Sequence, residues 1–154
     1  MLKEGGRAPA FSAEADGGKK VSLKDYKGQP LVLYFYPKDD TTGCTKEACD
    51  FRDSIAQFKR LKTAVLGVSK DSVEKHEKFK KKYNLNFPLL SDEEGKICEA
   101  YGVWKQKSMY GRKYMGIERT TFLIDSSGKV AKIYPKVKIP GHIDAVLADL
   151  KEIQ

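Results

Sequence analysis

Runs of apolar residues alternate with helical patterns along the whole chain. Four short apolar runs predict buried strands, and they read "QPLVLYFYP" (29–37), "TAVLGVS" (63–69), "FPLL" (87–90) and "RTTFLID" (119–125). Their nearly continuous apolar character is typical of central strands that are covered on both faces. Two hairpins are also expected, one around "EADGGKKVSL" and one that passes through "SSG" into "KVAKIYP".

Helical patterns fill the spaces between these strands. The first helix is expected from residue 41 to about 62, with apolar side chains at steps of four and three: Cys44, Ala48, Phe51, Ile55 and Phe58. A second helix should begin near Asp71 as N-cap, with Glu74 three residues later. A short helix over 94–103 and a last helix over 142–153 complete the pattern.

This order of elements predicts an α/β protein with a thioredoxin-like fold. We expect a central mixed sheet with helices on both faces, extended by an N-terminal hairpin. A chain of 154 residues without a linker or repeat is expected to form one domain, 1–154. The longest apolar run, 31–36, is too short to cross a bilayer, and the charged start lacks an apolar secretion signal, so we expect a cytoplasmic protein.

The formal charge of +8 raises the question of an anionic partner. Six of the lysines fall in "KDSVEKHEKFKKKYNL", where glutamates alternate with them at helical spacing, which indicates a solvated helix face. No helix-turn-helix, zinc-finger or ribonucleoprotein motif accompanies the charge. We therefore expect no nucleic-acid partner, although a basic binding module with incidental cysteines stands as the alternative of another class.

Two cysteines lie near the start of the first predicted helix, Cys44 in its first turn and Cys49 five residues later. Cys44 faces the apolar stripe, whereas Cys49 lies about 140° around the helix axis. Unpaired backbone N–H groups and the helix dipole favour a thiolate in the first turn, which makes Cys44 the candidate nucleophile. The alternative interpretation is that Cys44 serves only as a small, buried hydrophobic residue. Three cysteines in a chain without a secretion signal do not suggest a disulfide scaffold.

The segment "YPKDDTTGCTKEAC" (36–49) carries a recognisable motif. Pro37, Thr41 and Cys44 form the pattern P-x-x-x-T-x-x-C, which resembles the active-site signature of the peroxiredoxins. A second cysteine five residues after the first is similar to the Q-type subfamily, also called bacterioferritin comigratory proteins. The likeness continues through "GVWKQKSMYGRKYMGIERTTFLID" (102–125), where Arg119 matches the arginine of the family.

The resemblance implies a thiol-dependent peroxidase with an atypical two-cysteine cycle. Cys44 would attack a hydroperoxide, Thr41 and Arg119 would hold the peroxide oxygens, and Pro37 would shield the site. Cys49 would resolve the Cys44 sulfenic acid as an intramolecular disulfide, which thioredoxin or a glutaredoxin-type protein would reduce. The chemistry requires no metal or organic cofactor, and His76 and His142 offer no zinc-site spacing. We expect a monomer without a membrane partner. A general disulfide oxidoreductase would need Cys-x-x-Cys, which the chain lacks.

Several residues keep two interpretations. Glu47 could orient Arg119 or could be a solvated acid in the first turn of its helix. Cys98 is expected to be an inert core cysteine, and His76 a half-buried helix residue. The aromatic-rich segment 103–117 could cover the site or dock a reductant, and core cover is the simpler expectation.

Overall fold

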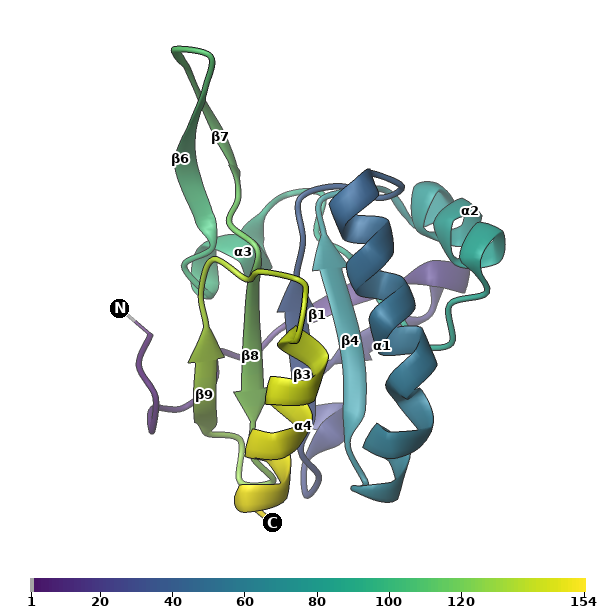
Figure 1. The fold of residues 1–154 in the computed structure, drawn as a ribbon, viewed down its shortest axis with the longest axis vertical. Helices are drawn as coiled ribbons and strands as arrows, with labels where there is room; N and C mark the ends of the chain where they lie inside the picture. Colours follow the sequence, from purple (N-terminus) through teal and green to yellow (C-terminus); the bar gives the residue numbers. More distant parts are fainter. Residues whose placement is uncertain (1) are drawn as a thin grey trace.

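The computed structural model describes residues 2–154, and a mixed sheet of seven strands forms its centre (Figure 1). The strands lie in the order β2-β1-β5-β4-β3-β8-β9. β3, β4 and β5 are parallel, and the other pairs are antiparallel. The mixed α/β class and the N-terminal hairpin are confirmed. The strand bounds are β1 Ser12–Ala15, β2 Lys20–Ser22, β3 Leu31–Phe35, β4 Ala64–Ser69, β5 Leu89–Ser91, β8 Thr120–Ile124 and β9 Val130–Tyr134.

Helices cover both faces of the sheet, as the sequence predicted. Three of them, α1, α2 and α4, pack on one face, and the short helix α3 packs on the other. Two 3₁₀ turns, η1 and η2, accompany the N-terminal hairpin. The bounds are α1 Thr42–Arg60, α2 Val73–Tyr83, α3 Lys96–Ala100, α4 His142–Glu152, η1 Asp16–Gly18 and η2 Leu23–Tyr26.

The central strand β3 is buried on both faces, which explains its continuous apolar run. Phe35 points to the α3 side, where its ring lies 5.4 Å from that of Tyr101. Tyr34 points to the α1 side and stacks on Phe51 at 4.5 Å. Burying an apolar side chain such as Phe35 contributes about 1.5–3 kcal/mol, so the apolar residues of β3 fix both layers to the sheet.

The apolar stripe of α1 is confirmed, because all five of its predicted members are buried. The start of α2 differs by one residue from the prediction. Ser72 is the N-cap, and its Oγ accepts a hydrogen bond from the Lys75 N–H at 3.2 Å. Asp71 does not cap the helix, because its carboxylate accepts from Ser69 and from the Asp39 backbone instead.

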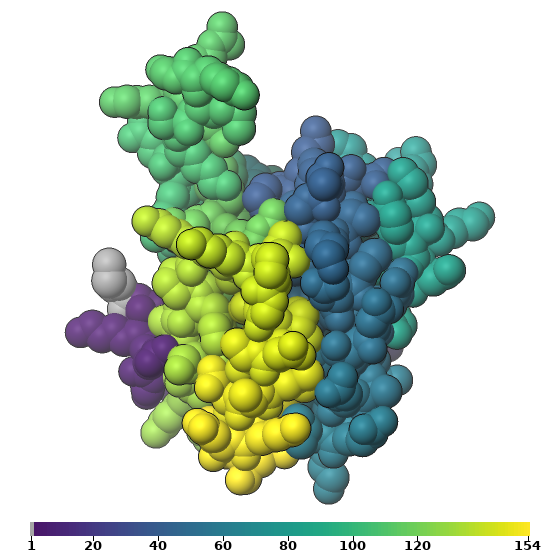
Figure 2. Space-filling view, in the orientation of Figure 1, coloured from purple at the N-terminus to yellow at the C-terminus, as the bar shows by residue number. Residues whose placement is uncertain are grey.

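Residues 104–117 form a hairpin that projects from the body of the protein (Figures 1 and 2). Its strands are β6 (Trp104–Met109) and β7 (Arg112–Ile117). Tyr110 and Gly111 both have positive φ, 52° and 78°, as in a type I′ turn. The expectation of core cover is wrong here, since Tyr110 is 99% exposed and a two-stranded ribbon has no second layer to bury its side chains.

The lysine-rich helix α2 presents a solvated face, as expected from its glutamate and lysine spacing. Lys80 pairs with Asp16 of η1 at 2.7 Å, and Lys82 pairs with Asp40 at 2.8 Å. None of the helices in residues 2–154 has the length and apolar character needed to span a membrane.

Candidate active site

The candidate site begins where β3 ends and α1 starts. Pro37 follows the strand and has no N–H for ladder pairing, so the chain leaves the sheet there. Asp40 then takes a left-handed conformation with φ 58°, and Thr41 is the N-cap of α1. Cys44 therefore lies in the first turn of α1, with only 1% of its surface exposed.

Sheet register brings Arg119 to this loop although it lies far away in sequence. β8 runs antiparallel to β3 and pairs Thr120 with Phe35, so Arg119 emerges beside the end of β3. Its Nη2 donates to the Cys44 Sγ at 3.4 Å, and its Nη1 donates to the Glu47 Oε1 at 2.7 Å. A guanidinium with a fixed fork of donors can thus hold a carboxylate and a sulfur together.

Glu47 orients the guanidinium, which decides between its two predicted roles. The side chain is almost fully buried, and burial raises its pKa to about 7 while the charge of Arg119 opposes the rise. Gly43 leaves the room that the ion pair needs, because a Cβ there would stand 3.2 Å from the Arg119 Nη2. Among residues 2–154, the Glu47 Oε2 has no hydrogen-bond partner, so this carboxyl is incompletely satisfied.

The other predicted site residues make no hydrogen bond to the Cys44 sulfur among the described residues. The Thr41 hydroxyl donates to the Lys38 carbonyl at 3.0 Å, and Pro37 is exposed. Cys49 is partly exposed and unbonded to Cys44. Both cysteines lie within the regular helix α1, so the reduced state keeps them apart.

Cys98 is a core cysteine, as predicted. It is fully buried under the sheet, and burial together with a hydrogen bond to Asp92 raises the pKa of its thiol. A buried thiol that stays protonated is a poor nucleophile. Cys98 is therefore set apart from the chemistry of Cys44.

Sequence reasoning missed Lys107 of the projecting hairpin. Its stem passes alongside Gly116, where a Cβ would stand 3.3 Å from the lysine chain. Burial lowers the pKa of Lys107, and the positive charge of Arg119 adds to that effect. The hairpin thus brings a second cation towards the site. Nothing in the sequence around Lys107 indicates this position.

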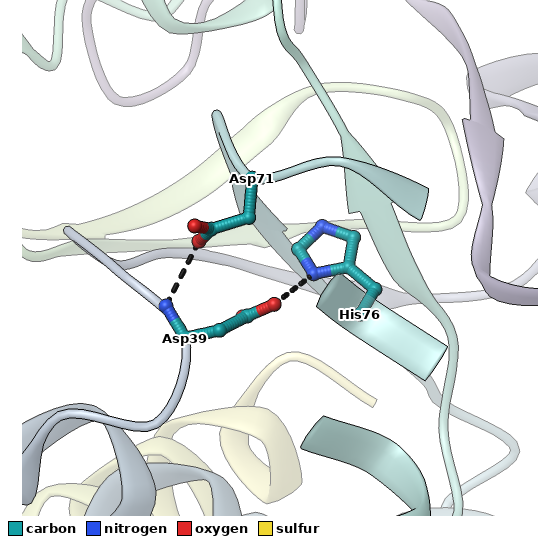
Figure 3. A group of neighbouring side chains, drawn as sticks. All are labelled: Asp39, Asp71 and His76. Carbon is teal, nitrogen blue, oxygen red and sulfur yellow. Dashed lines mark hydrogen bonds and ion pairs between the residues drawn. The ribbon is translucent and has the colours of Figure 1, made fainter. Parts of the chain in front are cut away.

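A buried polar cluster on the other side of the loop was also missed. Asp39, Asp71 and His76 have ligand-type atoms within 4.8 Å of one another (Figure 3). His76 is 0% exposed, so the prediction of a half-buried residue is wrong. Both of its ring nitrogens are engaged, by Asp39 and by the Leu90 carbonyl. The cluster is a satisfied hydrogen-bond network, with no free ring nitrogen for a metal ion.

Comparison with known proteins gives a consistent result. The pattern of the AhpC/TSA family matches residues 5–133. Peroxiredoxin Bcp of Bacillus subtilis is 54% identical over 152 residues, which cover 99% of this chain and 97% of that protein. A variant of Xanthomonas campestris peroxiredoxin Q has a similar structure, with a TM-score of 0.90 and 44% identity over 94% of this chain and 92% of that one.

A second solved structure connects this likeness to a reaction. It is that of the bacterioferritin comigratory protein of Xanthomonas campestris and concerns the alkyl peroxide reduction activity of that protein. Its TM-score is 0.88, with 44% identity over 92% of this chain and 90% of that chain. The thioredoxin-like fold predicted from the order of elements is confirmed by these neighbours.

Proposed function

The chain belongs to the AhpC/TSA family as a peroxiredoxin of the Bcp or Q type, and we propose that Cys44 and Cys49 carry its activity. Proteins of this type are thiol-dependent peroxidases, and the chain is therefore an oxidoreductase that uses a peroxide and a thiol reductant. The observation that carries the residue assignment is the Arg119 Nη2 at 3.4 Å from the Cys44 Sγ.

In the first half-reaction, the Cys44 thiolate attacks the terminal oxygen of a hydroperoxide. An S–O bond forms, the O–O bond breaks, and the leaving oxygen takes a proton as water or an alcohol. Negative charge moves from sulfur to the leaving oxygen, and Arg119 stabilises it from a position that Glu47 fixes in advance. Thr41 turns its hydroxyl from Lys38 to the bound peroxide, and Pro37 limits the approach of water.

In the second half-reaction, the Cys49 thiol attacks the Cys44 sulfenic acid. The S–S bond forms and water leaves, so the enzyme is oxidised by one disulfide. Thioredoxin or a glutaredoxin-type dithiol then reduces this disulfide by exchange. We propose that the protein works as a monomer with one domain, 1–154, and without metal or organic cofactor.

The test is the intact mass after one equivalent of hydrogen peroxide. The native chain should lose two hydrogens, Cys49→Ser should gain one oxygen, and Cys44→Ser should stay unchanged. Cys98→Ser is the matched control and should behave as the native chain, since Cys98 is buried away from the site. Oxidation of Cys44→Ser at the native rate would refute the assignment.

A further inference from the structure

The buried cluster of His76, Asp39 and Asp71 joins three separate segments of the chain (Figure 3). The His76 Nδ1 lies 2.6 Å from the Asp39 Oδ2, and its Nε2 lies 2.8 Å from the Leu90 carbonyl oxygen. His76 belongs to α2, Leu90 to β5, and Asp39 to the loop between β3 and α1. The imidazole therefore connects the active-site loop to the framework of the sheet.

The hydrogen bonds determine how many protons His76 and Asp39 hold between them. A carbonyl oxygen only accepts, so the His76 Nε2 must carry a proton. The 2.6 Å contact of Nδ1 with Asp39 then needs a second proton, on the ring or on the carboxyl group. The Tyr36 hydroxyl donates to the other Asp39 oxygen at 2.6 Å, which favours the carboxylate and places the proton on the ring.

The electrostatic surroundings agree with this placement. Burial by itself lowers the pKa of His76, but the hydrogen bonds to Asp39 and the Leu90 carbonyl, together with the charges of Asp39 and Asp71, outweigh it, and the pKa is raised. The titratable groups that face the ring are Asp39, Asp71 and Tyr36. With two carboxyl groups nearby and no cation among them, the site favours an imidazolium.

The same network fixes the backbone of the loop. The Asp39 N–H donates to the Asp71 Oδ2 at 2.8 Å, and the Ser69 hydroxyl donates to the same oxygen at 2.6 Å. Asp39 is thus bound through both its side chain and its main chain. Thr41 follows two residues later, directly before α1. A shift of Asp39 would therefore move Thr41 and its hydroxyl, whereas Cys44 is held by the core cluster that α1 packs against.

We propose that His76 is a positioning residue, a buried imidazolium that holds Asp39 and thereby the loop of Pro37 and Thr41 in the geometry that the peroxide needs. This inference rests on the proposed function of Cys44. It assigns to His76 no contact with the peroxide or with the sulfur. Its effect passes through Asp39, and it should appear only in reactions that require the loop.

Nitrogen NMR of the reduced native protein tests the protonation directly. Both ring nitrogens of His76 should carry a slowly exchanging proton at pH 7, with the shifts of an imidazolium. His142 is the internal reference, because burial lowers its pKa to about 4 and its ring should be neutral at pH 7. A neutral His76 ring, with the proton on Asp39 or absent, would overturn the proposal.

Kinetics of two reactions at Cys44 test the positioning role. In His76→Gln, oxidation by hydrogen peroxide should slow about tenfold, because misplacement of a positioning group by about 1 Å costs up to a hundredfold. Alkylation of Cys44 by iodoacetamide needs no peroxide-binding loop, so its rate should stay within about twofold. Asp39→Asn should likewise slow the oxidation by hydrogen peroxide and leave the alkylation rate nearly unchanged. Lys80→Gln, which removes an ion pair on the same helix, should change neither rate.

The outcomes separate the two hypotheses. Equal slowing of both reactions would indicate general destabilisation and would refute the positioning role, as would two unchanged rates. If Cys44 proved not to be the thiol that peroxide oxidises, the proposed function would fail instead. The NMR result on the native chain decides the protonation of His76 even if His76→Gln does not fold.

Discussion

Oxidation of Cys44 and Cys49 should unwind the start of α1. In a regular helix, residues five apart have Cα atoms about 8.6 Å from each other, from a rise of about 7.5 Å and a chord of about 4.3 Å. Disulfides rarely exceed about 6.8 Å between Cα atoms. Both cysteines lie inside α1, so the bond requires the Cα atoms to approach by about 2 Å and the side chains to turn towards each other.

The structure indicates which contacts this movement breaks. The Thr45 N–H bond to the Thr41 carbonyl, at 2.8 Å, lies in the first turn and should be lost. The Arg119 contact with Glu47 should also be lost, because Glu47 lies between the two cysteines. The later part of the stripe, from Phe51 onward, packs in the core and should remain helical.

Amide hydrogen exchange of the reduced and oxidised protein measures this directly. Protection should fall over residues 44–50 and should persist in β3, β4 and the rest of α1. Peroxide-treated Cys49→Ser is the control, because it forms the sulfenic acid without the disulfide and should keep its protection. Disulfide formation with unchanged exchange in 44–50, or pairing of Cys44 with Cys98, would refute the reasoning.

Two further predictions concern the Arg119 and Glu47 pair. Arg119→Ala should slow the peroxide reaction about a hundredfold, or roughly 3 kcal/mol in barrier; stopped-flow rates within a few-fold of native would remove Arg119 from the site. Burial raises the pKa of Glu47 from 4.5 to about 7, so the folded state binds its proton more tightly and stability should fall as pH rises through that window. The free energy of unfolding should fall by about 3 kcal/mol over this range, since each unit of pKa shift corresponds to about 1.4 kcal/mol. Glu47→Gln should not show this fall. Parallel stability profiles of the two proteins at pH 5 and pH 8 in chemical denaturation would contradict this.

Local patterns predicted the helices and the central strands because these elements depend mainly on residues that are close together in sequence. The stripe of α1 follows from helical spacing alone, and the two-sided burial of β3 follows from its unbroken apolar run. The start of α2 was misplaced by one residue because Asp71 and Ser72 are both good N-caps. The bonds that the Asp71 carboxylate accepts from the Asp39 N–H and the Ser69 hydroxyl decide between them.

The sequence predicted only those site residues that belong to a recognised motif. The pattern around Cys44 led to Arg119, whose place beside the sulfur otherwise depends on the register of β3 and β8. Glu47 kept two interpretations because its sequence position does not show what it faces. His76 lies 37 residues from Asp39 and outside the motif, and Asp39 occupies a position that the motif leaves unspecified, so their contact appears only in the folded chain.

The projecting hairpin makes the protein easy to modify at one point. Tyr110 and Gly111 form its tip, and their exposed two-residue turn lies outside both core clusters. Exposed turns of this kind tolerate insertions better than any position in a sheet. A peptide tag or a fluorophore inserted between Tyr110 and Gly111 should leave the body intact and would stand at the tip of the hairpin, where it could report on whatever approaches this end of the molecule.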